Sequence, residues 1–325
     1  MKRTFAIIGS IALLSASLWA MPAVAADPVR ADLNLGHADA ALQKLDAVLA
    51  QNPADAEAHN LRCRVYYQEE LWDQAVSDCE AAVQSNPSSS DYHLWLGRAY
   101  GQKASHASLM SAYKLARKVS AEFQKAVQLD PHSAPALADL GEFDVSAPSM
   151  VGGGISRAQA LVPQLQALDP AAAFNLQAKI AEAQKNYPVA ESSLKAAIAH
   201  SSSPAASWMD LAAFYRRRGQ MAQMTAALHN GASLDRQHSA ALVDGADNLT
   251  QAHLDPQTAI VWLQQYLSSR GQSEEAPAFA VRAKLAHLLA DQGDTYAAQQ
   301  QLAAAHAVAS GYRVPAHAFS SVAAR

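Results

Sequence analysis

Four prolines follow apolar, helix-like segments at nearly regular intervals along the chain. The segments are LAQNP, VQSNP, VQLDP and LQALDP, which end at Pro53, Pro87, Pro131 and Pro170. Proline cannot donate a backbone hydrogen bond, and it pushes the residue before it out of the α region, so each of these positions ends a helix. Pro53 and Pro87 are 34 residues apart, a spacing that indicates a repeated helical unit.

The composition favours helices over sheets. Half of the 325 residues are hydrophobic but only 7% are aromatic, and Ala and Leu supply most of the apolar content. Ala lets helices approach one another closely and loses no side-chain entropy in a helix. We therefore expect an all-α chain of many closely packed helices with a continuous buried core.

Equivalent positions of the repeated unit carry the same kinds of residue. The pattern W-x2-L-G-x2-Y is approximated twice, by Trp208, Leu211, Ala212 and Tyr215 and by His93, Leu96, Gly97 and Tyr100. The later pattern A-x3-F is approximated by Ala41 with Leu45, Ala75 with Cys79, Ala158 with Val162, Ala259 with Leu263 and Ala298 with Leu302. In these residues the chain resembles tetratricopeptide repeat (TPR) proteins of the type that bacteria export. The resemblance implies a right-handed α-solenoid, a superhelix of stacked antiparallel helix pairs.

The spacing of the prolines also predicts the domain organisation. We expect a TPR solenoid of about seven helix pairs over residues 26–310 and a C-terminal tail over 311–325. The 44 residues from Pro87 to Pro131 include an insertion near 101–118 whose apolar residues keep helical spacing, which predicts a lengthened helix pair. The 39 residues from Pro131 to Pro170 include an insertion near 146–154, which predicts a long turn at Gly152–Gly154.

The first residues have the three-part pattern of a secretory signal peptide. Lys2 and Arg3 precede the apolar run FAIIGSIALLSASLWA, and the small-residue stretch PAVAA follows it. We expect residues 1–25 to be removed, which leaves a soluble periplasmic protein; an uncleaved membrane anchor is the alternative. Nothing downstream approaches the roughly 18 to 20 apolar residues of a membrane span, so no membrane insertion is expected after cleavage.

In the TPR pattern both cysteines lie on the face where the two helices of one pair pack, with Cys63 opposite Ala75 and Cys79 one turn further along the axis. Cys63 takes the small Gly position of the first helix, and Cys79 takes the Phe position of the second. Cα–Cβ bonds tilt toward the N-terminus of their own helix, which brings the two sulfurs of an antiparallel pair together. In an oxidising compartment two cysteines have one possible pairing, so we expect a Cys63–Cys79 disulfide. Two buried thiols are the alternative.

Several functional classes are disfavoured. Without the leader, Lys plus Arg falls from 25 to 23 against 29 Asp plus Glu, a net charge of about −6, which argues against a nucleic-acid partner. The run SAYK at Ser111–Lys114 has the S-x-x-K spacing but lacks the accompanying S-D-N and K-T-G motifs. The twelve histidines are scattered without the spacing of metal ligands. We expect no catalytic residues, no metal and no cofactor.

The resemblance implies a concave groove that binds a protein or peptide partner through the first helices of the repeats. Beside the packing positions near Cys63 runs a stripe with Asn60, Arg64 and Tyr67, and one repeat later the stripe carries Asp91, Leu94 and Arg98. In-register stacking places Arg64 beside Arg98, and paired guanidinium groups suit a carboxylate.

We therefore predict Asn60, Arg64, Tyr67 and Arg98 as partner-binding residues of a periplasmic interaction scaffold. One alternative is that the two arginines pair with Glu57 and Asp91 on a wet surface. At the level of function, the alternative is a ligand-holding TPR component of a periplasmic transport system.

Overall fold

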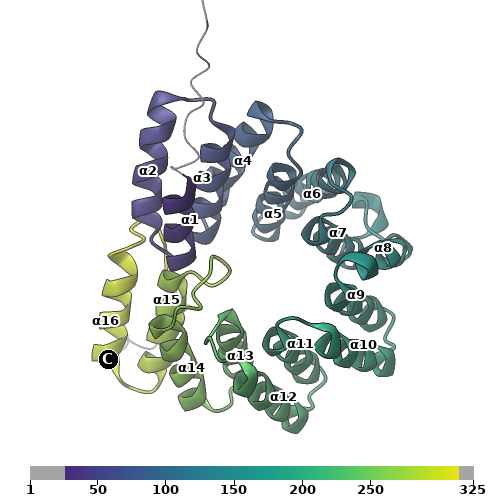
Figure 1. Cartoon of the computed structure of the whole chain (residues 1–325). Helices are drawn as coiled ribbons and strands as arrows, with labels where there is room; N and C mark the ends of the chain where they lie inside the picture. The colour runs from purple at the N-terminus through teal and green to yellow at the C-terminus, as the bar shows by residue number, and fades with distance from the viewer. Residues whose placement is uncertain (1–25, 315–325) are drawn as a thin grey trace, which may run out of the picture.

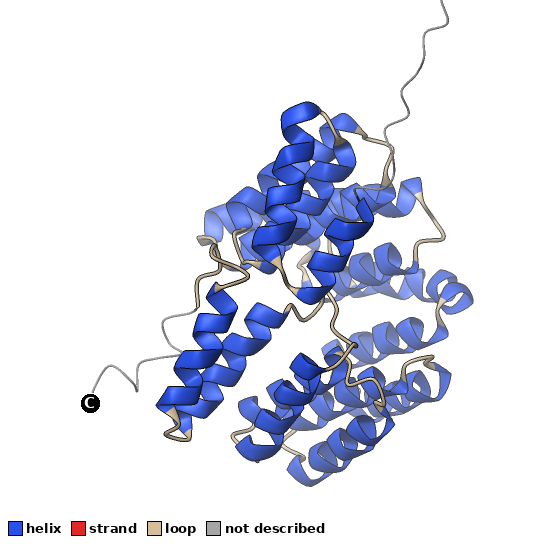
Figure 2. Cartoon of the chain, turned by 60° about the vertical axis from the view of Figure 1, so that its left-hand side comes forward, coloured by secondary structure: helices blue, strands red, loops and turns tan. Residues whose placement is uncertain are grey.

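The protein folds into stacked helices (Figure 1). The computed structural model describes residues 26–314, which form sixteen α-helices and one short 3₁₀ helix and contain no strand (Figure 2). None of the helices in this range combines the length and the hydropathy that a membrane span requires. The expected signal peptide and most of the expected tail lie outside the described residues.

The helices form eight consecutive pairs, one more than the seven or so expected. The first helices of the pairs are α1 (Ala26–Leu35), α3 (Ala56–Gln68), α5 (Ser90–Ser105), α7 (Ala134–Ser146), α9 (Pro170–Ala183), α11 (Pro204–Arg217), α13 (Ala240–Gln251) and α15 (Ala278–Asp291). The second helices are α2 (Ala38–Gln51), α4 (Trp72–Ser85), α6 (Leu109–Leu129), α8 (Ile155–Leu168), α10 (Tyr187–His200), α12 (Met221–Leu234), α14 (Pro256–Ser268) and α16 (Thr295–His306). Figure 1 shows the first helices on the inner side of the curve and the second helices on the outer side. This arrangement is the predicted α-solenoid.

The prolines end helices as predicted. The residues before Pro53, Pro87, Pro131 and Pro170 all leave the α region in the same way, with φ between −134° and −143° and ψ between 85° and 94°. A polar residue shortly afterwards caps the next helix: the Asp55 carboxylate, for example, accepts a hydrogen bond from the Ala58 backbone N–H at 2.9 Å. The connections at Pro53, Pro87 and Pro131 are therefore short and built in the same way, whereas at Pro170 the capping residue is Asp169, directly before the proline.

Two irregular segments coincide with the two insertions. Helix α6 has 21 residues, whereas α4 and α8 have 14 each. Between α7 and α8 the chain makes a long turn that contains the 3₁₀ helix η2 (Ser149–Val151). Gly152 and Gly154 in this turn have φ of +103° and +146°, values that L side chains rarely adopt. A Cβ atom on Gly153 would lie 2.1 Å from the Ala147 carbonyl oxygen, so this position also requires glycine.

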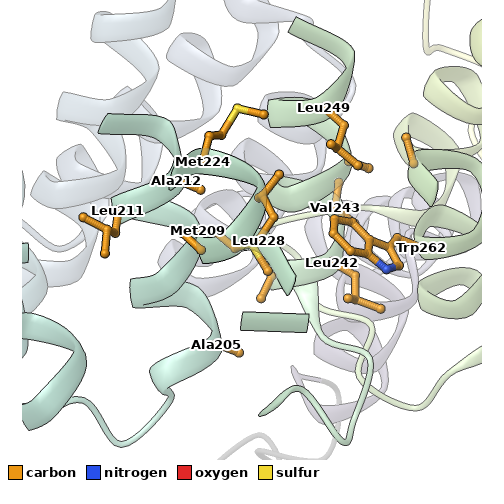
Figure 3. Close-up of a cluster of buried hydrophobic side chains, with 14 of the residues drawn as sticks. Ala205, Met209, Leu211, Ala212, Met224, Leu228, Leu242, Val243, Leu249 and Trp262 are labelled. Carbon is orange, nitrogen blue, oxygen red and sulfur yellow. The ribbon is translucent and has the colours of Figure 1, made fainter. Parts of the chain in front are cut away.

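The largest core cluster lies between the pairs of the C-terminal half (Figure 3). Leu211 and Leu228 are 1% exposed, and they belong to the same cluster as Leu242 and Trp262 two helices further along. Ala212, with no exposed surface, lies among these larger side chains and lets the helices approach closely. The packing of apolar faces between neighbouring pairs holds the stack together.

The solenoid closes on itself, so the first and last pairs are in contact (Figure 1). The Asp39 N–H donates to the Val308 carbonyl oxygen at 3.0 Å, and the Ser310 hydroxyl donates to the Asp39 carboxylate at 2.9 Å. Leu33 near the start of the described chain shares one buried cluster with Phe279 and Tyr312 near its end. We call this contact between the ends the closure.

Candidate interaction site on the inner face

Polar side chains connect each first helix to the next around the inner side of the solenoid. The connections are Arg30 to Glu57, Asn60 to Asp91, Arg98 to Asp139, Lys179 to Glu142, Asn175 to Asp210, Arg217 to Glu182, Arg216 to Asn248 and Lys284 to Asp247. Partners in these connections come from consecutive repeats, so the inner face is polar along its whole length.

Two arginines and two aromatic rings gather where α3 meets α5. The Arg64 guanidinium carbon lies 4.7 Å from the Trp95 ring centroid, and that of Arg98 lies 4.8 Å from the same ring. The Tyr67 ring meets Trp95 edge-on, with centroids 5.6 Å apart. Cations over an indole face are attracted by its quadrupole, which holds both guanidinium groups beside one aromatic platform. We call Arg64, Trp95 and Arg98 the arginine–tryptophan cluster.

Each arginine of the cluster also has an acidic partner. Arg64 pairs with Glu274, which lies in the connection between α14 and α15, and Arg98 Nε donates to the Asp139 carboxylate at 2.6 Å. The Arg64 Nε N–H is buried and has no hydrogen-bond partner among the described residues. Burial, the largest single influence, lowers the pKa of Arg98, but the hydrogen bond to Asp139 and the nearby negative charges together raise it further than burial lowers it. The cluster also has one unused donor, the Nε N–H of Arg64.

The structure brings together three of the four predicted site residues. Arg64, Tyr67 and Arg98 meet around Trp95, whereas Asn60 is fully buried and donates to the Asp91 carboxylate at 3.3 Å. The arginines have acidic partners other than Glu57 and Asp91, because Glu57 pairs with Arg30 and Asp91 accepts from Asn60.

The predicted stripe includes Leu94 and leaves out Trp95. Both residues belong to one core cluster and are 4% and 9% exposed, respectively, but the Trp95 ring also contacts Arg64 and Arg98. Trp95 lies four residues after Asp91 and three before Arg98, which is an equally good helical spacing. That spacing and the aromatic character of Trp95 were the available signal.

A pocket of about 600 Å³ lies between α7, α9 and α11, further along the inner face. Leu194 and Val145 are among the apolar residues that line it. Two ion pairs border it, Lys179 with Glu142 at 2.6 Å and Arg217 with Glu182 at 2.7 Å.

Asn175 supplies an unused acceptor to this pocket. Its Nδ2 donates to the Asp210 carboxylate at 3.2 Å, while its Oδ1 is buried without a hydrogen-bond partner among the described residues. Desolvation raises the pKa of Asp210. A buried acceptor without a partner is costly, and an N–H group of a ligand would satisfy it. We call this cavity the α9 pocket.

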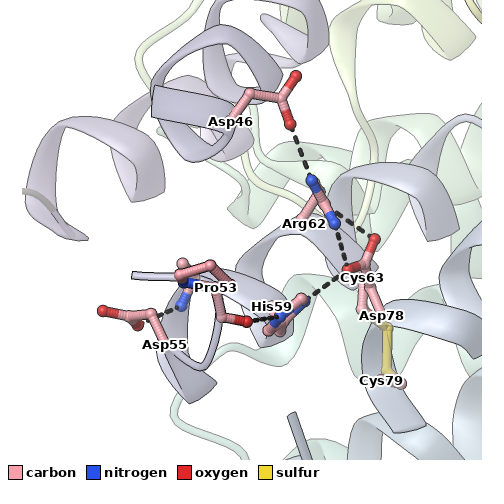
Figure 4. Close-up of polar contacts among 9 residues, drawn as sticks. Asp46, Pro53, Asp55, His59, Arg62, Cys63, Asp78 and Cys79 are labelled. Carbon is pink, nitrogen blue, oxygen red and sulfur yellow. Dashed lines mark hydrogen bonds and ion pairs between the residues drawn. A yellow bond between two sulfur atoms is a disulfide. The ribbon is translucent and has the colours of Figure 1, made fainter. Parts of the chain in front are cut away.

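The region around the two cysteines has a structural role (Figure 4). Cys63 and Cys79 form the expected disulfide, with Cα atoms 5.3 Å apart, and it joins α3 to α4. Next to it, the Arg62 guanidinium donates hydrogen bonds to both carboxylate oxygens of Asp78. His59 Nδ1 lies 2.7 Å from Oδ1 of the same carboxylate. These contacts stabilise the helix pair on which Arg64 and Tyr67 are mounted.

His59 and His93 do more than fill the Trp position of the repeat. His59 Nε2 lies 3.0 Å from the Pro53 carbonyl oxygen, and His93 Nε2 lies 3.1 Å from that of Pro87. The other ring nitrogen of His93 contacts Glu122 of the second helix at 2.6 Å. Each histidine thus ties the proline turn to the second helix of its repeat.

The stacked helix pairs and the polar inner face define a helical-repeat protein. The family model for the tetratricopeptide repeat matches residues 29–90 and 175–223. The matched segments are similar to tetratricopeptide repeats, lie in both halves of the chain, and carry Arg64 of the cluster and Asn175 of the α9 pocket. A comparison with curated proteins gave no match.

Several solved structures are similar to this chain. A thermophilic TPR protein from Thermus thermophilus is 20% identical, with 63% of this chain and 98% of that protein covered and a TM-score of 0.44. A tetratricopeptide repeat protein from Parabacteroides merdae is 12% identical, with 76% and 92% covered and a TM-score of 0.49. A chain of the APC/C hetero-tetramer Cut9–Hcn1 is 15% identical, with 82% and 49% covered and a TM-score of 0.41.

Proposed function

We propose that the protein is a non-catalytic scaffold that binds a peptide segment of a protein partner along its inner face. The observation that carries this proposal is the α9 pocket, which three consecutive first helices line and in which Asn175 Oδ1 lacks a partner among the described residues. An extended peptide offers a backbone N–H to that oxygen, and its side chains can occupy the apolar part of the pocket near Leu194.

The arginine–tryptophan cluster is proposed as the second contact, for a carboxylate of the same partner. Arg64 Nε has an unused N–H, and guanidinium groups bind carboxylates through parallel hydrogen bonds. Tyr67 and Trp95 limit the motion of the two side chains, which lowers the entropy lost on binding. Asn60 contributes indirectly, by donating a hydrogen bond to the Asp91 carboxylate beside the arginines.

Capture of the partner with matched tryptophan variants tests the use of the α9 pocket. Ser146 lines the pocket and Ser192 on α10 does not, although both are exposed and both donate from the hydroxyl to a carbonyl of their own helix at 2.9 Å. Tagged protein is crosslinked mildly and captured partners are identified by mass spectrometry. Ser146→Trp should abolish capture of a stoichiometric partner while Ser192→Trp retains it. Equal capture by both variants contradicts the proposal.

The proposed compartment is the periplasm, after export and removal of the leader. The signal-peptide pattern of residues 1–25 supports export. The Cys63–Cys79 disulfide supports an oxidising compartment, because such bonds persist there. Intact-mass analysis of exported protein should give an N-terminus near Ala26 or Asp27. A species that retains Met1 in the membrane fraction contradicts cleavage.

The volume of the α9 pocket supports a second candidate function, a ligand-holding component of a periplasmic transport system. About 600 Å³ is within the range of small-molecule sites. Native mass spectrometry of protein purified without denaturation distinguishes the two. A bound small molecule that Ser146→Trp displaces supports the transport role, and a mass equal to that of the chain alone supports the scaffold.

A further inference from the structure

Large apolar side chains are exposed together at one end of the α5–α6 pair. Leu109 is 92% exposed, Met110 72% and Met150 70%, and Tyr113 is 41% exposed. The Tyr113 hydroxyl lies 3.5 Å from the Met150 carbonyl oxygen, so the turn that holds η2 lies against the start of α6. We call Leu109, Met110, Tyr113 and Met150 the α6 tip.

The core of the solenoid does not require the α6 tip. The buried residues of α6 are Val119, Ser120, Phe123 and Ala126, all in the second half of the helix. Helix α6 is seven residues longer than α4, which corresponds to about 10 Å at 1.5 Å per residue. The first turn of α6 therefore extends beyond the packed part of the pair, to which Leu115 already belongs, and no element among residues 26–314 buries the tip.

Positive charge surrounds the tip. One exposed stripe of α6 starts at Met110 and continues with three cations, Lys114, Arg117 and Lys125. The spacings of four, three and eight residues keep them on the same side of the helix. These three cations have no acidic partner among the described residues, where Lys103 and Lys118 pair with acids of α4.

Acidic residues are absent from the sequence around the tip. Segments 101–121 and 145–156 contain no Asp or Glu, although the whole chain has 29 acids and a net charge of −4. The tip therefore combines exposed apolar side chains with unopposed positive charge in an otherwise acidic protein.

We propose that the α6 tip docks the protein on an anionic lipid surface. Leu109, Met110 and Met150 enter the boundary between head groups and acyl chains, where an amphipathic ring such as that of Tyr113 is also favoured. Lys114 and Arg117 remain in the head-group layer and bind the anionic groups. This docking is peripheral and leaves the inner face free for a peptide.

The shape of the tip favours lipid over an acidic protein. The apolar residues project from the end of an extended helix pair, with the cations further back on the same helix. A deformable layer that is apolar inside and anionic at its surface matches this order along the helix. A folded protein partner would need an apolar cavity with an acidic rim at the same depth.

Sedimentation with lipid vesicles tests the proposal. Protein isolated after export is mixed with vesicles of phosphatidylcholine alone or of phosphatidylcholine with phosphatidylglycerol. The protein should sediment with the anionic vesicles, and binding should fall as salt is raised. Leu109→Ser with Met110→Ser, and separately Lys114→Glu with Arg117→Glu, should weaken binding roughly tenfold or more.

Matched substitutions elsewhere control for apolarity and charge. Val189→Ser with Leu234→Ser removes apolar side chains that are 45% and 51% exposed, and Arg236→Glu with Arg270→Glu reverses two exposed cations. These variants should bind as the unmodified protein does. All substituted residues are exposed, and an unchanged circular dichroism melt verifies folding.

Three results overturn the proposal. The first is equal binding to neutral and anionic vesicles, or no binding to either. The second is equal loss in the tip and control variants. The third is self-association, or capture of an acidic protein, that the tip variants abolish while the unmodified protein leaves anionic vesicles unbound; this result assigns the tip to a protein contact.

Discussion

Arg64 of α3 forms an ion pair with Glu274, 210 positions later in the sequence. The contact brings the connection before the last helix pair to the arginine–tryptophan cluster, which lies between the second and third pairs. Gln68, one turn after Arg64, donates to the Glu274 carbonyl oxygen at 3.1 Å and to that of Leu33 at 3.2 Å. The Glu274 carboxylate thus occupies the position that a ligand carboxylate would take at Arg64, so the proposed site and the closure share one residue.

Replacing Glu274 should therefore strengthen binding of a carboxylate at Arg64. Glu274→Gln removes the competing charge while it keeps the shape of the side chain, so Arg64 is freed for the partner. We expect capture of the partner, or of a peptide with a free C-terminal carboxylate, to tighten by roughly three- to tenfold, which corresponds to about 0.6 to 1.4 kcal/mol of binding free energy. Fluorescence anisotropy with a labelled peptide measures the change.

Glu275→Gln is the matched control, because Glu275 is the next residue, is exposed and forms no ion pair with an arginine or lysine among the described residues. It should leave the affinity for the peptide unchanged. If Glu274→Gln binds the peptide more weakly than Glu275→Gln, Glu274 does not compete with the peptide carboxylate for Arg64. Glu274 then helps to hold Arg64 in the geometry that binds the peptide.

Glu69 makes the stability of the fold depend on pH. It is 1% exposed, lies at the closure next to Gly311, and neither of its carboxylate oxygens has a hydrogen-bond partner among the described residues. Burial, together with the nearby charge of Asp39, raises the pKa of Glu69 from 4.5 to about 7. Between these values the folded state binds more protons than the unfolded state, so the free energy of unfolding falls as pH rises from about 4.5 to 7.

The Glu69→Gln variant should show a shallower dependence of stability on pH than the unmodified protein. The neutral amide removes a penalty of roughly 3 kcal/mol above pH 7, as 1.36 kcal/mol per pKa unit implies. Asp244, whose pKa is also raised to about 7 by burial and by the neighbouring acids, keeps its own contribution to the slope. Urea unfolding at pH 5 and pH 8 compares the variant with the unmodified protein and with Glu70→Gln, in which an exposed neighbour is changed. A slope with pH that is as steep in Glu69→Gln as in the unmodified protein assigns the effect to other groups.

Two glycines of α5 should respond to alanine with opposite signs. A Cβ atom on Gly97 would lie 2.5 Å from the ring of Phe123, whereas on Gly101 the nearest atom, of Val119, is 4.0 Å away. Gly97→Ala should lower the free energy of unfolding by about 1 to 3 kcal/mol through overpacking. Gly101→Ala should raise it by roughly 0.5 to 1 kcal/mol, because alanine favours the helix. If both substitutions shifted the urea midpoint in the same direction, the result would contradict the packing of α5 on α6.

Loss of the disulfide should destabilise the second helix pair. Cys63 and Cys79 are 16 positions apart and fully buried, and a loop of this size implies about 3 kcal/mol. The double variant Cys63→Ala with Cys79→Ala should have a lower urea midpoint, by the amount that a loss of about 3 kcal/mol in the free energy of unfolding implies. Reductant should have the same effect on the unmodified protein and none on the double variant; an unmodified protein that is insensitive to reductant contradicts a bridge in solution.

Local signals in the sequence were sufficient to predict the helix pairs. The residues before Pro53 and Pro87 leave the helix because of a steric clash with the proline ring, which depends on no distant part of the chain. The pairing of Cys63 with Cys79 likewise depends on one hairpin. The position of Trp95 between the two arginines is harder to predict. Leu94 and Trp95 are adjacent, and both three and four residues after Asp91 are helical spacings that keep a residue on the same stripe.

The closure could not be predicted from the sequence. It depends on the sum of small rotations between eight pairs, and each rotation follows from side-chain packing that no local pattern specifies. Asp39 and Ser310 carry no signal that they bond to each other, and Glu274 lies in an ordinary connection. The structure brings the predicted Arg64, Tyr67 and Arg98 together around Trp95, and the acid that pairs with Arg64 comes from the far end of the chain. Their role in binding a partner stays a prediction.

The closure also changes how the fold can come apart. In an open array of repeats the terminal units have a single neighbour, so fraying begins there and proceeds inward. Here the unit that contains Leu33 packs against the unit that contains Phe279, which leaves every unit between two neighbours. Detaching any one of them therefore breaks two interfaces rather than one. No unit is terminal in the packing, although the polypeptide itself still has two ends.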